Sequence, residues 1–464
     1  MAVCSSISIS QVEYLRLDAD FYHPKYLQEL ETWRTLDERI GVAKLSHLIS
    51  APVRTGRTPS ARHIKEEDEI VPFIKTDGIR EGRINFDSAG ELPKRVLNGT
   101  DFIPADSVVV TIIGATPEIV GRAAIVRDAD PRCVTNQNVA VITTNSKCDP
   151  YFLTAYLQTS FGRDQLWRHS RRTEQVNLNC REVERVLVPT PVISLQNEIG
   201  DMVRASFAAT DDSESLYTQA QQLLESELGL DRLRFDKPVG YTARFSELEL
   251  SRRADAEFFN PEYQAIISVA KEHSHSLLGR LFSIRRGVCI DPRLYNEEIG
   301  RPYIRIKELS LNQPLSKDDS VRIDEKYVLA AYPQARAGDY ILAVIGATIG
   351  KINLISGELD GSLFSNNTAC LSPKLHIEQP NAYELLLRSE IIQKQIQQRM
   401  AKTAQEKISD PELKRILVPT LPKPALEQLE NLVVSSKQNH FLSKQLLDQA
   451  KSRVEQLIEE AVQA

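Results

Sequence analysis

The chain has 464 residues, enough for two or three domains of ordinary size. Hydrophobic residues make up 42% and charged residues 26%, a globular balance, and the formal net charge is -6 at pH 7. This acidic balance excludes a protein that coats nucleic acid through bulk positive charge, but it leaves room for a local basic face. No apolar run approaches the roughly 20 residues that span a bilayer, and residues 1–10 lack a signal-peptide pattern.

The six cysteines show neither metal-ligand nor redox-pair spacing. None belongs to a Cys-x-x-Cys pair, and no histidine is spaced as a zinc partner. We therefore predict reduced thiols, no metal site and a cytoplasmic protein. The cysteines are Cys4, Cys133, Cys148, Cys180, Cys289 and Cys370.

The first half of the chain returns in the second half. Three motifs recur in the same order, at offsets that drift only from 237 to 230 residues. The chain is therefore two diverged copies of one unit. The paired motifs are Asp18–Tyr26 with Asp255–Tyr263, Ile113–Thr116 with Ile345–Thr348, and Arg185–Thr190 with Arg415–Thr420. Weaker matches pair Thr173-x-Gln175 with Thr403-x-Gln405, and Asn136–Asn138 with Asn366–Asn367.

Each copy predicts the same elements in the same order. An amphipathic helix comes first and is followed by a continuous β-branched strand that ends in a Gly-Ala-Thr turn. A helical stretch, a short Leu-Val-Pro strand and a long helix complete the copy. The predicted ranges are 22–37, 108–113, 151–169, 187–189 and 194–228 in the first copy, and 258–271, 340–345, 381–400, 417–419 and 425–462 in the second.

The two long helices carry an apolar stripe at spacings of three and four residues, with little Gly or Pro inside. Each is on the order of 50 Å long, and an isolated helix of that length must bury its stripe. The obvious partner is the long helix of the other copy, packed antiparallel because like units make self-complementary contacts. The alternative is two separate core helices in two domains.

We therefore predict a mixed α+β fold with two similar globular domains. Two long helices, packed as an antiparallel coiled coil with pseudo-two-fold symmetry, separate the domains. The predicted boundaries are 1–190 for the first domain with its N-terminal segment, 191–235 for the central helix, 236–424 for the second domain and 425–464 for the C-terminal helix.

Motif searches find no catalytic constellation. The sequence has no phosphate-binding loop, no Gly-x-Gly-x-x-Gly turn and no Gly-x-Ser-x-Gly elbow. Asn260-Pro-Glu-Tyr263 superficially matches the Asn-Pro-Pro-Tyr loop of adenine methyltransferases, but its counterpart is His23-Pro-Lys-Tyr26. No glycine-rich cofactor turn accompanies either motif, so we predict that each proline starts a helix.

Local charge is more informative than the average. Residues 45–190 carry 19 basic and 18 acidic residues, residues 275–420 carry 20 and 17, and residues 191–260 carry 7 and 13. The two globular regions are thus slightly basic and the connector is acidic. Phosphates require such cations, and base edges require Arg, Lys, Asn or Gln. Each cluster is equally compatible with a solvated surface. The clusters are Arg54–Arg57, Arg168–Arg172, Arg285–Arg286 and Arg305–Lys307.

In this order, the motifs resemble type I restriction–modification specificity subunits along nearly the whole chain. The opening Leu48 to Pro59, the Phe73–Ile79 strand and loop, Ile345–Lys351 and the closing Leu187–Pro191 fit the family pattern. No single motif is decisive, but their repeated order is distinctive. The second copy departs from the pattern with Arg286-Gly-Val-Cys289 in place of Gly-x-Thr-Pro, and the first with Pro117–Arg122 in place of Ile349-Gly-Lys351.

The resemblance implies two target-recognition domains, no catalysis in this chain, and double-stranded DNA as the ligand. It implies two methyltransferase subunits and restriction subunits as partners, which would use S-adenosylmethionine, ATP and Mg²⁺, while this chain holds no cofactor. Two alternatives are a DNA reader of a related defence system, and a methyltransferase or nuclease with an unrecognised site. The predicted DNA-contacting residues are Arg54, Arg57, Lys75, Arg171, Arg172, Arg286, Arg305 and Lys307.

Overall fold

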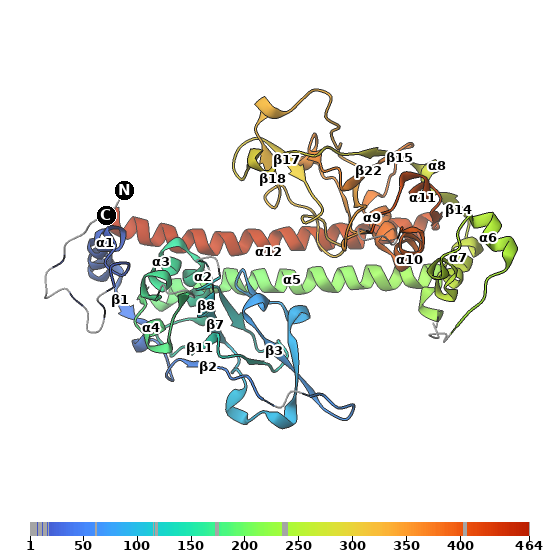
Figure 1. Ribbon diagram of the computed structural model, residues 1–464. Coiled ribbons are helices and arrows are strands. Elements are labelled where there is room, and N and C mark those ends of the chain that lie inside the picture. The colour runs from blue at the N-terminus through green and yellow to red at the C-terminus, as the bar shows by residue number, and fades with distance from the viewer. Residues whose placement is uncertain are drawn as a thin grey trace. The chain divides into compact units, whose positions relative to one another are not determined.

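The computed structural model describes residues 7, 12, 16, 18–60, 63–114, 116, 119–171, 176–233, 240–401 and 406–463. It divides into two compact units. Unit 1 comprises residues 1–209 and 441–464, and unit 2 comprises residues 210–440. Two long helices, α5 (Ile193–Leu228) and α12 (Lys423–Gln463), are each divided between the two units (Figure 1). The predicted long helices are confirmed to within two residues.

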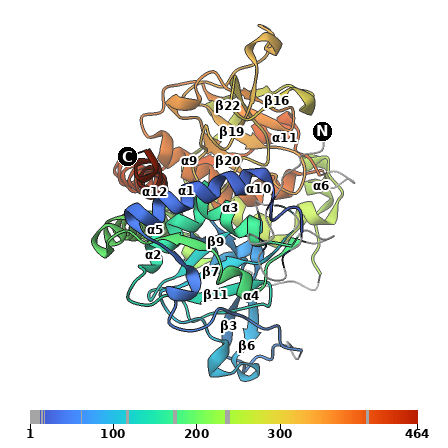
Figure 2. The same cartoon turned by 90° about the vertical axis from the view of Figure 1, so that its left-hand side faces the viewer.

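Unit 1 places a four-stranded antiparallel sheet, in the order β2-β11-β7-β9, behind helices α2 and α3 (Figure 2). A second, smaller sheet has the strand order β10-β3-β6. Two-stranded pairs join β1 to β13, β12 to β8 and β4 to β5. The elements are α1 (Pro24–Ile40), β1 (Val42–Lys44), β2 (Arg54–Thr55), β3 (Ile70–Ile74), β4 (Ile79–Arg80), β5 (Arg83–Ile84), β6 (Gly90–Pro93), β7 (Ser107–Thr111), β8 (Ile113–Gly114), β9 (Ala123–Val126), β10 (Val134–Thr135), β11 (Val139–Thr143), α2 (Pro150–Gln158), α3 (Ser160–His169), β12 (Val176–Asn177), α4 (Cys180–Val183) and β13 (Leu187–Pro189).

Unit 2 repeats the four-stranded main sheet and the two-stranded pair next to the long helix, and its second sheet has one strand more. Its main sheet runs β15-β22-β19-β20, its second sheet runs β16-β18-β17-β21, and β14 pairs with β23. The elements are α6 (Phe245–Ser251), α7 (Pro261–Glu272), β14 (His275–Leu277), α8 (Leu278–Leu281), β15 (Phe282–Arg286), β16 (Tyr295–Asn296), β17 (Arg301–Ile304), β18 (Val321–Ile323), β19 (Tyr340–Ala343), β20 (Ile352–Leu354), β21 (Leu363–Phe364), β22 (Thr368–Pro373), α9 (Pro380–Arg388), α10 (Glu390–Arg399), α11 (Asp410–Lys414) and β23 (Leu417–Pro419).

The continuous β-branched runs form the central strands, as predicted. All five residues of β7 and all four of β19 are buried, because sheet neighbours flank both strands and helices cover them. Each unit has one large core that joins the main sheet to the long helices. In unit 1 this core contains Val203 and Phe207 of α5 together with Val454 and Ile458 of α12.

The predicted helical stretches 151–169 and 381–400 are wrong in one respect, because each is two helices. The break in unit 1 falls at Thr159, whose backbone is extended and whose hydroxyl accepts from the Gly162 amide at 3.2 Å. A Cβ on Gly162 would lie 2.2 Å from the Tyr156 carbonyl oxygen, so the close turn requires glycine. In unit 2 the break falls at Ser389, which is likewise extended. Neither break follows from apolar periodicity, because the stripe continues through it.

The arginine two residues before each Asp-Ala-Asp/Glu-Phe motif has a structural role in both units. Arg16, two residues before the first motif, donates to the carbonyls of Arg168 and His169 at the end of α3, at 3.2 and 3.0 Å. Arg253 in unit 2 donates to the carbonyls of Arg399 and Met400, both at 3.4 Å. Each arginine thus neutralises a helix C-terminus. The following prolines, Pro24 and Pro261, start α1 and α7, which confirms the helix-start interpretation.

The two long helices pack on each other within each unit, as predicted. In unit 1, Ser206 of α5 donates its hydroxyl to the Ser443 carbonyl of α12 at 2.8 Å. In unit 2, Ser213 and Ser436 each donate to the other's carbonyl at 2.8 Å. A step of seven residues forward on α5 therefore corresponds to seven residues backward on α12, which is an antiparallel arrangement.

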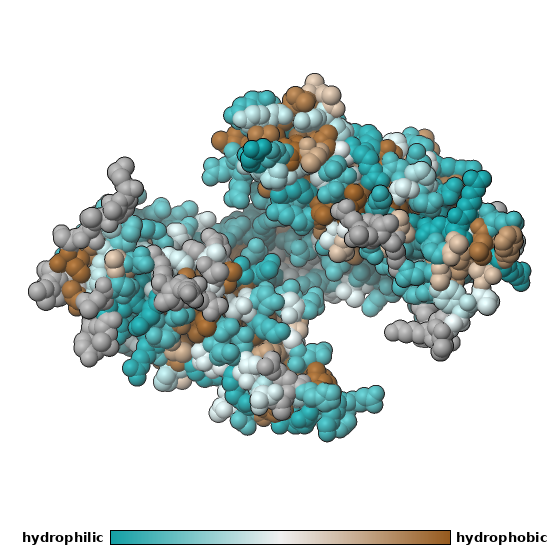
Figure 3. Space-filling view, in the orientation of Figure 1, coloured by the Kyte–Doolittle hydropathy of each residue, from teal (hydrophilic) through white to brown (hydrophobic). Residues whose placement is uncertain are grey.

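Among the described residues, no helix is long and apolar enough to cross a membrane, and no group of three or more His, Cys, Asp or Glu side chains could hold a metal. The five described cysteines are free thiols, and Cys4 lies outside the described residues. The face drawn in Figure 3 is mostly hydrophilic, with apolar side chains gathered over the part of unit 2 that holds β17 and β18. Ile299 and Leu329, which flank these strands in the sequence, are exposed.

Candidate nucleic-acid interface

Three of the predicted cations in unit 1 lie on adjacent segments. Arg54 is on β2, Arg57 follows that strand, and Lys75 follows β3. The Thr135 hydroxyl of β10 donates to the Ile74 carbonyl at 2.9 Å, and a Cβ on Gly56 would lie 1.8 Å from the Thr135 carbonyl oxygen. Gly56 therefore lets the backbone after β2 approach β10, and this approach brings the three cations to one region.

These three cations differ in the hydrogen bonds and ion pairs that they make within unit 1. Arg54 donates to the Phe102 carbonyl at 2.7 Å. Arg57 makes a two-pronged contact with Asp101, at 2.7 and 2.6 Å. This hydrogen bond raises the pKa of Arg57 and lowers the pKa of Asp101. Lys75 is exposed and has no carboxylate partner among the described residues, so it is the cation most available to a ligand.

Sequence reasoning missed Arg132, which belongs to the same region. Its guanidinium lies 4.5 Å from the centre of the Phe102 ring, next to the carbonyl that Arg54 binds. The Thr58 hydroxyl donates to the Gln137 side-chain oxygen at 2.6 Å. This contact leaves the amide group of Gln137 as a donor beside the cations. Arg132 is isolated in the sequence, so the cluster search could not find it.

Unit 2 carries its predicted cations at the equivalent strand ends. Arg286 closes β15, and Arg305 follows β17 as Lys75 follows β3. Arg286 is paired with Asp410 through its Nε at 2.7 Å. Arg305 binds Glu308 and lies 4.9 Å from the centre of the Tyr295 ring. Lys307 is 66% exposed, and its Nζ is 3.8 Å from Glu308.

The second copy departs from the sequence pattern without changing this geometry. A Cβ on Gly287 would lie 2.0 Å from the Phe364 carbonyl oxygen. Gly287 thus makes the same close approach to β21 that Gly56 makes to β10. The glycine is therefore the part of the Gly-x-Thr-Pro motif whose close approach both units share.

Arg171 lies apart from the strand-end cations. Its Nε donates to Glu182 at 2.7 Å, and this hydrogen bond raises its pKa. The Arg171 side chain is 54% exposed and its backbone bridges to Asn177. Arg172 lies outside the described residues, as do the Thr173-x-Gln175 and Thr403-x-Gln405 motifs.

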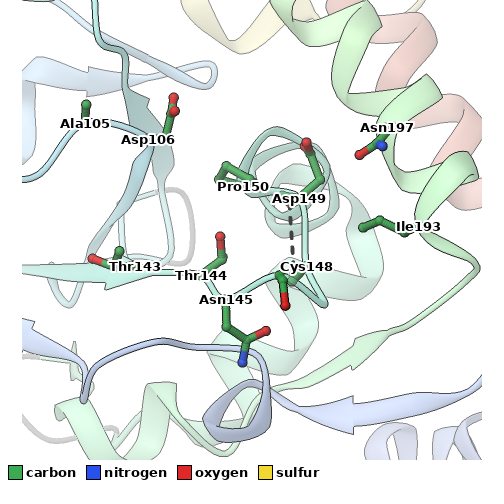
Figure 4. A pocket seen from close by; sticks show the side chains of 11 residues that line it. Ala105, Asp106, Thr143, Thr144, Asn145, Cys148, Asp149, Pro150, Ile193 and Asn197 are labelled. Carbon is green, nitrogen blue, oxygen red and sulfur yellow. Dashed lines mark hydrogen bonds between the residues drawn. The ribbon is translucent and has the colours of Figure 1, made fainter.

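A cavity of about 390 Å³ in unit 1 has two carboxylates in its lining, Asp106 and Asp149 (Figure 4). Tyr151 donates its hydroxyl to Asp106 at 3.0 Å, and burial together with Asp106 raises the pKa of Tyr151 to about 12. Arg204 binds Asp149 at 2.5 Å. Both carboxylates therefore have structural partners, and the described lining offers no positioned pair of nucleophile and base.

Comparison with known proteins identifies a family domain in the first half of the chain. Residues 42–221, from β1 into α5, match the family model of the type I restriction modification DNA specificity domain. A curated relative, the StySPI type I restriction enzyme specificity subunit of Salmonella potsdam, is 18% identical over 159 residues. That match spans 34% of this chain and 34% of the relative, about a third of the length of each.

Solved structures of low identity are also similar over most of the chain. The S subunit of a type I restriction-modification system from M. genitalium is 15% identical with a TM-score of 0.42, covering 91% of this chain and 94% of that one. The HsdS subunit from Thermoanaerobacter tengcongensis is 16% identical with a TM-score of 0.29, covering 91% and 95%. Residues 42–221 therefore carry a type I restriction modification DNA specificity domain, and unit 2 has the same main-sheet arrangement.

Proposed function

We propose that the chain is the DNA-reading subunit of a type I restriction–modification complex and reads a bipartite site. The observation that carries this proposal is the repetition of the specificity-domain topology, with cations at equivalent strand ends in both units. One such domain reads few base pairs, whereas two domains on a helical spacer read a split site whose unread gap is set by the spacer.

The proposal includes partners. Two methyltransferase subunits and the restriction subunits would act at the site in the cytoplasm, using S-adenosylmethionine, ATP and Mg²⁺, while this chain contributes recognition and no chemistry. The motif searches support this division of labour, since the sequence carries none of the nucleotide-binding or nucleophile motifs that such chemistry uses.

The proposal predicts that the purified chain alone transfers no methyl group and cuts no DNA. Incubation with labelled S-adenosylmethionine and duplex DNA should leave the DNA unlabelled. The same chain purified with its methyltransferase subunits should label a site made of two separated half-sites. Methyl transfer by the chain alone contradicts the non-catalytic role, and labelling at one uninterrupted motif contradicts bipartite reading.

We propose that DNA contact falls on the strand-end cations and on the half-exposed Arg171. Two arguments support this choice of residues. Residues that hold phosphates should recur where both units have the same backbone path, and Lys75 and Arg305 do so. Arginines paired with acids, such as Arg57, are held in fixed geometry and can present their remaining donors to a phosphate or a base edge. The proposed set is Arg54, Arg57, Lys75, Arg171, Arg172, Arg286, Arg305 and Lys307.

Replacing a phosphate-contacting cation should weaken binding to all DNA sequences equally. For Lys75→Ala we expect the slope of log affinity against log salt to flatten by about one unit, because one fewer counterion is released. A base-reading arginine should instead cost about 1–3 kcal/mol on its cognate base alone. Fluorescence anisotropy across a salt series measures both effects.

The matched control is Arg34→Ala on α1, because Arg34 is 73% exposed and paired with Glu31. It should leave both affinity and slope unchanged. If Arg54, Arg57, Lys75, Arg286, Arg305 and Lys307 can all be replaced without loss of affinity, the interface lies elsewhere.

A further inference from the structure

In unit 1, one arginine joins the recognition domain to both long helices. Arg83 on β5 donates to the Ser206 carbonyl and hydroxyl of α5 at 2.8 and 3.0 Å. The same Nη2 lies 2.6 Å from the Ser443 hydroxyl of α12. Its guanidinium also lies 4.8 Å from the centre of the Phe207 ring. A single side chain from the domain therefore contacts α5 and α12 where they cross.

The backbone that carries Arg83 is held in place. Strands β4 and β5 form a tight hairpin whose turn, Glu81-Gly82, has two successive positive φ angles of 48° and 79°. Such a turn matches the twist of its strands. The Gly82 carbonyl accepts from the Ile125 amide of β9 at 3.2 Å, and a Cβ on Gly82 would lie 2.8 Å from the Gln158 side chain of α2. The hairpin is thus hydrogen-bonded to the main sheet and lies close to α2.

In unit 2, other residues join α5 and α12 to each other and to the domain. Its serine pair, Ser213 with Ser436, is reciprocally bonded between the two helices. The position equivalent to Phe207 is Lys437, which binds Glu384 of α9. Tyr217 of α5 donates to the Leu311 carbonyl at 2.9 Å. Among the residues that the structure describes, the arginine contact to the serine pair therefore occurs in unit 1 and has no counterpart in unit 2.

We propose that Arg83 is a positioning residue that fixes the orientation of the first recognition domain on the helical spacer and so sets how strictly the gap between half-sites is measured. This rests on the proposed bipartite reading. One added base pair moves a half-site by about 3.4 Å and turns it by about 35°. A domain that Arg83 holds to both helices cannot rotate with the displaced half-site. A domain that lacks this contact can rotate part of the way.

The test uses the full chain assembled with its methyltransferase subunits and three duplexes. These carry the same half-sites with the natural gap or with one base pair more or fewer. Wild type should strongly prefer the natural gap in both binding and methylation. In Arg83→Ala, that preference should fall by roughly tenfold, the scale on which losing a charge-assisted hydrogen bond shifts an equilibrium. The half-site sequences should stay the same.

Two further variants separate positioning from general damage. Arg80→Ala removes an exposed arginine directly opposite Arg83 in the same hairpin, and should keep the gap preference whatever it does to affinity. Ser443→Ala removes one acceptor from α12 and should lower the preference less than Arg83→Ala, with no additional loss in the double variant. This arm keeps the proposal testable if Arg83→Ala folds poorly.

The outcomes are distinguishable. If wild type shows no split site at all, the proposed function fails. If wild type reads a split site but both Arg83→Ala and Ser443→Ala keep its full gap preference, the positioning role of Arg83 is overturned. A uniform loss of affinity at all three gaps also overturns it, because that result indicates damage to DNA contact or folding and no change in measurement.

Discussion

Inserting four residues into both long helices should lengthen the gap between the half-sites by one or two base pairs and leave the half-sites unchanged. The insertion points are after Ala209 in α5 and after His440 in α12, where each helix passes from one compact unit to the other. Four residues add about 6 Å and rotate the helix about 40° beyond a full turn. One to two base pairs correspond to about 3.4–7 Å and 35–70°. Sequencing of methylated sites, with the methyltransferase subunits present, measures the gap.

Two controls make this result specific. A two-residue insertion at the same points turns the apolar stripe away from its partner, so it should destabilise the helix pair and abolish methylation. Four residues inserted after Gly240 lie in an exposed segment without regular secondary structure, with open space around the glycine, and should keep both half-sites and gap. An unchanged gap after the paired helix insertion, or altered half-sites with the old gap, means that the helices are not the spacer.

Replacing Glu384 by alanine should lower the free energy of unfolding of unit 2 by about 3–5 kcal/mol. The Glu384 carboxylate is 1% exposed and binds Arg388 at 2.6 Å, Lys437 at 2.5 Å and the Leu354 amide at 2.8 Å. The substitution leaves two cations without their acid, and Arg388 is itself only 4% exposed. Urea unfolding followed by far-UV circular dichroism, with each transition fitted separately, measures the loss.

The pH dependence of the same network gives a second readout. Burial raises the pKa of Glu384, but Arg388 and Lys437 outweigh it, and the net pKa is lowered. The network's stabilisation is therefore complete above the ordinary glutamate pKa of about 4.3 and is lost as pH falls through the lower folded value. Glu384→Gln should remove this dependence.

A surface pair provides the matched control for Glu384. Glu378 is 63% exposed and lies 3.4 Å from Lys423. Glu378→Ala should change the free energy of unfolding by no more than about 0.5 kcal/mol, because water and salt screen the pair. Equal effects of the two substitutions would show that the buried network does not stabilise unit 2.

Much of the fold was predictable because its signals are local. The duplicated motifs, the buried strands at 107–111 and 340–343, and both long helices follow from periodicities within a few residues of each position. The helix breaks at Thr159 and Ser389 were not predictable, because the apolar stripe runs through them. The break at Thr159 arises from capping and from close approach of the backbone, as Gly162 shows.

The candidate interface likewise has features that the sequence predicts and features that only the tertiary structure shows. The sequence by itself determined the local cation clusters, such as Arg54–Arg57 and Arg305–Lys307, and the family pattern placed Lys75 on the strand and loop at Phe73–Ile79. Only the tertiary structure decided which of them are bound to acids, because Arg57 finds Asp101 and Arg286 finds Asp410 across 44 and 124 residues. It also brought Arg132 to Phe102 and placed Arg83 on Ser443, 360 residues away. Contacts of that separation depend on how the sheets and helices pack, and no local pattern encodes them.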